Sequence, residues 1–127
     1  ALPICCRYPM PWSKDIGNLD TFRFLQKLTK IKTESPAFKN GGFKFVYAEG
    51  YIFAFARFTA EEVYFTVISG ETEEKTINIS LNCFGESFSN GIAPEKDALG
   101  EKLCATIENG NLVLKVSAGK AYLVKMH

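Results

Sequence analysis

Histidine is almost absent from this chain: there is one in 127 residues, and it is the last residue, His127. A Ser-His-Asp or Cys-His mechanism, like a His-ligated metal site, needs a histidine that the fold holds in place, and chain ends are ordinarily frayed. The glycines form neither a G-x-G-x-x-G fingerprint nor a P-loop, so no phosphate cradle is expected. The sequence therefore predicts no metal site and no cofactor.

Excess charge and long apolar runs are missing as well. Fifteen Lys and Arg against fourteen Asp and Glu give a net charge of +1, whereas nucleic-acid binding needs a clustered basic excess. No apolar run approaches the roughly 18 residues that cross a membrane, and the start of the chain does not read as a signal peptide. We therefore expect neither nucleic acid nor membrane as a partner, and a cytoplasmic location.

The cysteine pattern supports neither a disulfide framework nor a zinc site. Cys5 and Cys6 are adjacent, Cys83 and Cys104 are distant, and no C-x-x-C pair occurs. We interpret all four as free thiols in a reducing compartment, with Cys104 serving as a small apolar residue in a strand.

What the chain does have is enough length for one core, with 46% apolar and 13% aromatic residues. Its fourteen acidic residues mark no pair that converges on a pocket, so we interpret them as surface charge rather than an acid–base pair. The clearest examples lie in turns or polar runs: Glu61, Glu62, Glu71, Glu73 and Glu74.

One helix is predicted near the N-terminus. Asn18 has the residue type of an N-cap, and Ser35-Pro36 ends the helix because the residue before proline avoids the helical region. Apolar residues recur at every third position and are interpreted as one helical face: Leu19, Phe22, Leu25, Leu28 and Ile31.

After Gly42 the apolar period changes to two, which is typical of β-strands. Residues 51–58 are apolar on both faces and therefore predict a central strand covered on both sides. Asn109-Gly110 predicts a tight hairpin. The expected fold class is all-β, a Greek-key β-sandwich of seven or eight strands preceded by one helix. Strands are expected at 43–47, 51–58, 63–68, 76–81, 103–107, 112–116 and 121–126.

Five phenylalanines in the expected strands have two interpretations: Phe43, Phe45, Phe53, Phe55 and Phe65. They could form a platform that stacks on sugar rings or bases, or fill the space between two sheets. The second arrangement is the more common one and is favoured here. A β-barrel that holds an apolar ligand is a further hypothesis, and only the phenylalanine content supports it.

The loop Cys6-Arg7-Tyr8-Pro9-Met10-Pro11-Trp12 contains the only tryptophan of the chain. From the residues alone we interpret it as a cap in which Met10 and Trp12 cover the end of the helix. In the alternative, Arg7 and Trp12 lie at the rim of a larger substrate site.

The order of these motifs resembles the C-terminal end of the α-amylase superfamily, glycoside hydrolase family 13, and looks closest to its neopullulanase, cyclomaltodextrinase and maltogenic amylase branch. The resemblance rests on the Arg-x-Pro-Met loop, the helix, and then 34–38, 42–45, 52–57 and 63–68. It implies that residues 1–36 are the loop and last helix of a catalytic (β/α)8 barrel and that 37–127 are a C-terminal β-sandwich.

The family's catalytic aspartate, glutamate and second aspartate lie on barrel strands ahead of this loop, so the resemblance assigns no catalytic residue to this chain. It implies a non-catalytic domain that packs on the barrel and stabilises it. The parent would hydrolyse or transfer α-glucosidic bonds in maltooligosaccharides or related α-glucans with retention. The partners implied are the barrel, α-glucan through the parent, and a second copy if the apolar helix face stays uncovered. The alternative function is a carbohydrate-binding module with exposed aromatics.

Overall fold

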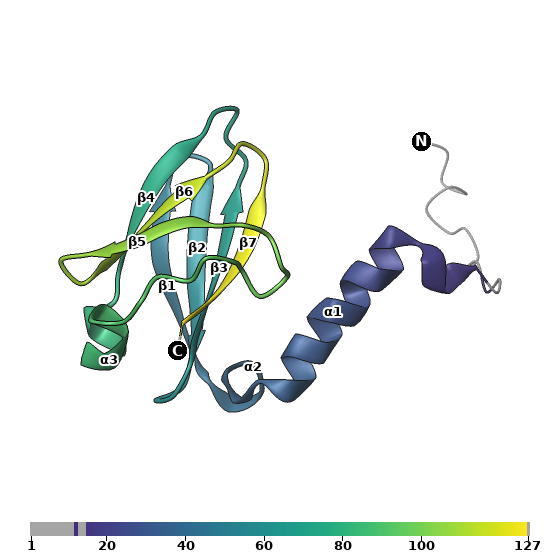
Figure 1. Ribbon diagram of the computed structural model, residues 1–127, viewed down its shortest axis with the longest axis horizontal. Coiled ribbons are helices and arrows are strands. Elements are labelled where there is room, and N and C mark those ends of the chain that lie inside the picture. Colours follow the sequence, from purple (N-terminus) through teal and green to yellow (C-terminus); the bar gives the residue numbers. More distant parts are fainter. Residues whose placement is uncertain (1–11, 13–14, 127) are drawn as a thin grey trace.

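The structure, a computed structural model, describes Trp12 and residues 15–126 (Figure 1). It contains two antiparallel sheets and one long helix near the N-terminus, which confirms the predicted all-β sandwich. The helical elements are η2 (Ile16–Asn18), α1 (Asp20–Glu34), α2 (Pro36–Asn40), η3 (Asn82–Phe84) and α3 (Glu86–Ser89). The strands are β1 (Gly42–Glu49), β2 (Ile52–Phe58), β3 (Val63–Ser69), β4 (Lys75–Ser80), β5 (Cys104–Glu108), β6 (Asn111–Val116) and β7 (Ala121–Met126).

The chain passes twice between the sheets. One sheet has the order β1-β2-β3-β7 and the other β4-β6-β5. The β3–β4 connection leaves the first sheet, and β7 returns from the second to pair with β3. Asn109 and Gly110 join β5 to β6 with φ values of 52° and 76°, which confirms the predicted hairpin, because a tight turn of this kind needs positive φ at both residues.

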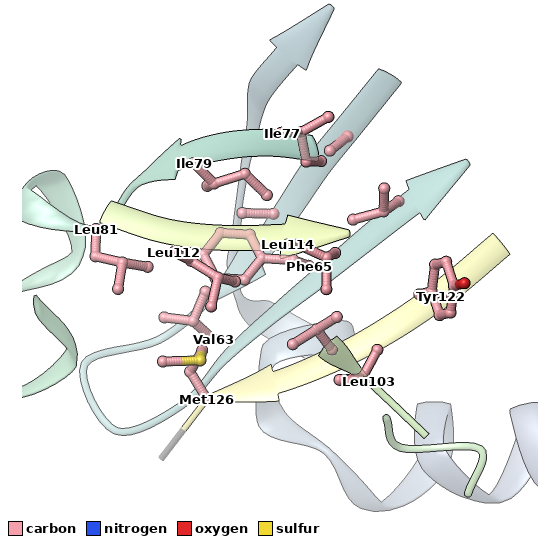
Figure 2. Packing of buried hydrophobic residues seen from close by; sticks show 14 of the residues in the cluster. Val63, Phe65, Ile77, Ile79, Leu81, Leu103, Leu112, Leu114, Tyr122 and Met126 are labelled. Atoms are coloured by element: carbon pink, nitrogen blue, oxygen red, sulfur yellow. The ribbon is translucent and has the colours of Figure 1, made fainter. Parts of the chain in front are cut away.

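The core lies between the inner faces of the two sheets (Figure 2). Ile77 and Ile79 alternate with polar residues along β4, and Leu81 continues the pattern one residue beyond it. All three are buried, as their period of two predicts. Phe65 is fully buried among residues of the opposite sheet, including Leu112 and Leu114.

The helix begins differently from the prediction. Asn18 is not the N-cap, because it lies in η2, where its backbone N–H donates to the carbonyl of Asp15. Its side-chain oxygen accepts a hydrogen bond from Nη2 of Arg23 at 3.1 Å. Leu19 therefore occupies the cap position of α1, with no side-chain cap bond. The predicted end at Ser35 is confirmed, although Pro36 at once begins the short helix α2.

The expectation that β2 is covered on both sides is wrong. The strand lies between β1 and β3, as a central strand should, and Ala54 and Ala56 are fully buried on its inner face. On its outer face Phe53 is 41% exposed. Apolar residues on both faces of a strand indicate that both faces favour burial. They do not indicate that residues of this chain bury the outer face.

The two orientations of phenylalanine predict different costs of truncation. Phe65→Ala should lower the free energy of unfolding by about 3–5 kcal/mol, because it leaves a cavity in a closed core. Phe53→Ala, on the open face, should cost much less in the isolated chain. Urea unfolding of both variants measures the difference, and equal losses would contradict the assignment of the two faces.

Candidate docking surface

Glu62 holds the start of α2 against the sandwich. Its Oε1 accepts hydrogen bonds from Oγ of Ser35 and, at 3.0 Å, from the backbone N–H of Ala37. Its Oε2 lies 3.7 Å from Nζ of Lys125, and the side chain is 14% exposed. A carboxylate that accepts backbone N–H bonds at the first turn of a helix stabilises that turn. The prediction that Glu62 is solvated loop charge is therefore wrong.

The pKa of Glu62 follows from this environment. Burial alone raises the pKa of the carboxyl, but the hydrogen bonds from Ser35 and Ala37 and the nearby ammonium of Lys125 outweigh it. The pKa of Glu62 is consequently lowered from its ordinary value of 4.5.

Arg57 holds the other end of α2. Its Nε donates to the carbonyl of Ala37, and its Nη2 donates to the carbonyls of Phe38 and Gly41, all at 3.3 Å. A guanidinium in this position satisfies carbonyls that the end of a short helix leaves without partners. We call Arg57 and Glu62 the linker clasp, because together they attach the segment between α1 and β1 to the sheet.

α1 leaves the linker clasp and extends away from the sandwich (Figure 1). Within the described part of the chain, no residue of α1 is buried. Leu28 and Ile31, near its C-terminal end, pack against a small cluster of Ala37, Tyr64 and Leu123. Phe24 is half exposed and Leu25 is 54% exposed. The helix thus contacts the sheet near its C-terminal end, and the apolar side chains of Phe24 and Leu25 stay partly uncovered.

The apolar residues of α1 do not form the single face that was predicted. An α-helix turns about 100° per residue, so a strict spacing of three drifts by about 60° at each step. Phe24, Leu28 and Ile31 face the sheet. Phe22 and Leu25 lie farther round the helix, so α1 is apolar on two sides.

A groove of about 980 Å³ separates α1 from the outer face of β3 and β7. On the sheet side, the loop that contains Leu99 and Glu101 forms part of its wall. Asp97, which is buried, fixes that loop: its carboxylate accepts from the N–H groups of Leu99, Glu101 and Leu123. The apolar lining residues are Phe24, Leu28, Ile31, Phe38, Ile68, Leu99, Ala121, Tyr122 and Leu123.

Four phenylalanines form a second apolar area on the outer face of β1 and β2, the phenylalanine face: Phe43, Phe45, Phe53 and Phe55. Their rings contact one another, with centroids 5.1 to 6.5 Å apart. Phe45 is 63% exposed. The interpretation of these residues as filler between sheets is therefore wrong for all four and correct for Phe65. Phe53 pairs with Ile68 across β2 and β3, which connects the phenylalanine face with the groove.

Only one of the two predicted rim residues, Trp12, lies within the described structure. Arg7 lies outside the described residues, so its pairing with Trp12 stays a prediction. Trp12 is 81% exposed and so does not form the covering cap of the other interpretation, and Met10 also lies outside the described residues. Cys83 and Cys104 are free thiols, but Cys104 is exposed in β5 rather than packed.

Two further features of the described residues bear on the nature of the site. No group of three or more His, Cys, Asp or Glu side chains there could hold a metal ion. None of the described helices is long and apolar enough to cross a membrane.

Known proteins resemble the chain in sequence and in fold. Cyclomaltodextrinase from Thermoanaerobacter pseudethanolicus is 29% identical over 120 residues, which are 94% of this chain and 19% of that protein. Alpha-amylase 2 from Dictyoglomus thermophilum is 29% identical over 94 residues, 74% of this chain and 16% of that protein. The solved structure of the maltogenic alpha-amylase AmyB from Thermotoga neapolitana matches with a TM-score of 0.68 and 13% identity, over 93% of this chain and 27% of that one. No protein-family model matches the chain.

These matches fit a C-terminal region of the cyclomaltodextrinase and maltogenic amylase branch of glycoside hydrolase family 13. The chain spans about a fifth of the length of the curated relatives it matches. The match to AmyB leaves out 7% of 127 residues, about nine, whereas α1 alone has 15. At least part of the helix is therefore included in the shared fold together with the sandwich.

The lowered pKa of Glu62 predicts a pH-dependent contribution to stability. Because the folded-state pKa lies below the unfolded value, the carboxylate stabilises the fold above about pH 4.5, and this contribution is lost as pH falls through the folded pKa. At pH 7, Glu62→Gln should lower the free energy of unfolding by about 1–3 kcal/mol. Urea unfolding should show this gap closing in acid.

Glu61→Gln is the matched control. Glu61 is exposed, its backbone N–H donates to Oγ1 of Thr59, and its carboxylate accepts no hydrogen bond from the described residues. Its effect should stay within about 0.5 kcal/mol at every pH. A Glu62→Gln deficit that persists unchanged below the folded pKa would contradict the assignment.

Proposed function

We propose that this chain is the non-catalytic C-terminal domain of an α-amylase-family glycosidase and that it packs on the catalytic barrel of its parent and stabilises it. Residues 1–36 are assigned to the loop and last helix of the barrel, and residues 37–127 to the β-sandwich. The parent hydrolyses or transfers α-glucosidic bonds in maltooligosaccharides or related α-glucans. The chain itself supplies no catalytic residue.

α1 is the observation that carries this proposal. A helix with apolar residues on two sides is typical of one that is buried between two bodies, and helices of this length are marginal in water without packing. Here the sandwich covers one side of α1 near its C-terminal end, where Leu28 and Ile31 are half-buried. A second body that covers the remaining surface, the barrel, accounts for the rest.

The proposed boundary between barrel and sandwich falls in the segment that the linker clasp attaches to the sheet. Ser35 lies on the helix side of the boundary and Ala37 on the sandwich side, and Glu62 accepts a hydrogen bond from each. The sandwich thus holds the last turn of the proposed barrel helix directly. Such a contact transmits the stability of one part to the other, because separating them would break both hydrogen bonds to the carboxylate.

The longer gene is the direct test. The reading frame ahead of Ala1 should encode a (β/α)8 barrel with two catalytic aspartates and a catalytic glutamate. A frame that encodes no such barrel would contradict the proposal.

A helix variant tests packing in the parent enzyme. Leu25→Lys should shorten the half-life of activity at elevated temperature while leaving the initial rate of maltooligosaccharide hydrolysis unchanged, because it places a charge in the barrel–helix interface. Asn78→Lys adds the same charge at an exposed residue of β4, in the sheet that does not border the groove, and should have a much smaller effect. Equal half-lives for the two variants would argue against an interface at Leu25.

The phenylalanine face favours one alternative, a carbohydrate-binding module whose aromatic rings stack on sugars. Phe53 and Phe55 lie nearly parallel, with an interplanar angle of 18° and centroids 6.5 Å apart. Calorimetric titration of the 127-residue chain with maltoheptaose separates the two functions. We expect no saturable heat, whereas binding that Phe53→Ala abolishes would support the alternative.

A further inference from the structure

The groove between α1 and the sheet has an apolar floor and a charged rim. On α1, Lys27 and Lys32 border the stripe of Phe24, Leu28 and Ile31. At about 100° per residue, Lys27 lies about 40° to one side of Ile31 and Lys32 about 40° beyond Leu28 on the other. The stripe is therefore flanked by an ammonium group on each side.

The rim carries more cations than anions. Arg23 and Lys120 also line the groove, and the acidic lining residues are Asp20 and Glu101. Arg23 already donates to the carbonyl of Gly17 and to Asn18. In the described part of the chain, the one ion pair is that of Glu62 with Lys125. Lys27, Lys32 and Lys120 thus have no carboxylate at ion-pair distance there.

This arrangement has the form of one half of a helix–helix seam. In such seams an apolar stripe packs against a partner's stripe, and the flanking charges pair with opposite charges across it, which sets the choice and direction of the partner. The groove is also preformed. The linker clasp fixes the C-terminal end of α1, and Asp97 fixes the loop of Leu99 and Glu101 on the opposite wall. A partner would therefore bind with little reorganisation of this chain.

We propose that the groove receives an amphipathic helix of the parent's own catalytic part, whose apolar stripe is bordered by Asp or Glu side chains that pair with Lys27, Lys32 and Lys120. This inference rests on the proposed function and adds the chemistry of the partner. A second copy of α1 is disfavoured as occupant, because it would place its own lysines against Lys27 and Lys32. A neutral sugar is disfavoured too, because the floor is mainly aliphatic and offers few polar groups.

Carbodiimide cross-linking of the intact parent enzyme, followed by peptide mass spectrometry, tests the inference. This reagent joins an amine to a carboxylate only when the two are in contact. Lys27, Lys32 or Lys120 should cross-link to Asp or Glu residues of one helical segment outside this chain. The yield should be about tenfold or more above that of Lys30, which does not line the groove, because a held pair has a high effective concentration.

A charge-reversal variant of the same parent gives a second readout. Lys27→Glu with Lys32→Glu should lower its Tm, and the loss should shrink by about half or more in 1 M NaCl, where charges are screened within about 3 Å. Lys30→Glu with Lys39→Glu changes the net charge equally away from the groove and should not lower the Tm in this salt-dependent way.

The outcomes separate this inference from the proposed function. If Leu25→Lys destabilises the parent but Lys27 and Lys32 cross-link no better than Lys30, the domain packs on the barrel and the acid-bordered helix is refuted. Cross-links from Lys27 to a carboxylate of a second copy would replace the proposed occupant with a dimer. If neither Leu25→Lys nor the charge reversal has an effect, the proposed function fails as well.

Discussion

The position of α1 depends on one set of contacts, the hydrogen bonds by which Arg57 and Glu62 hold the backbone of the five-residue helix α2. The carboxylate satisfies donors at the start of this short helix, and the guanidinium satisfies acceptors at its end. Arg57 projects from the outer face of β2, and Glu62 lies in the turn between β2 and β3. A five-residue helix has little stability of its own, so α2 depends on these contacts, and the direction of α1 depends on α2.

Two apolar areas follow from that placement. The groove lies between α1 and the outer face of β3 and β7, and the phenylalanine face continues across the same outer face to β1 and β2. The inner face of this sheet is already covered by the second sheet. Much of the outer face of this sheet and part of α1 stay exposed. Large apolar patches are rare on isolated soluble proteins, which supports the proposed packing on a second body.

Local pattern predicted most of the elements. The strands 43–47 and 76–81 occur with small shifts of their ends, because alternation reports directly which side chains share a face. The strand 63–68 occurs as well, and its short, nearly continuous apolar run is typical of a buried strand. The Asn109-Gly110 turn was predictable for a similarly local reason. Glu62 was missed as a site residue because its partners are 25 and 27 residues earlier in the chain, and an adjacent pair such as Glu61-Glu62 gives no sign that one member folds inward.

The sequence by itself determined the strand order along the chain, the single long helix and the inward residues of β4, since each depends on neighbours within a few positions. Its motifs also carried the resemblance to family 13. Tertiary structure alone decided that Phe53 faces outward while Phe65 is buried, because both lie in strongly apolar strands and only the second sheet covers one face. It also decided which side of α1 faces the sheet, that the carboxylates of Asp97 and Glu62 accept hydrogen bonds from backbone N–H groups, and that lysines border an apolar groove. These features arise from contacts between segments far apart in the chain, which no local pattern encodes.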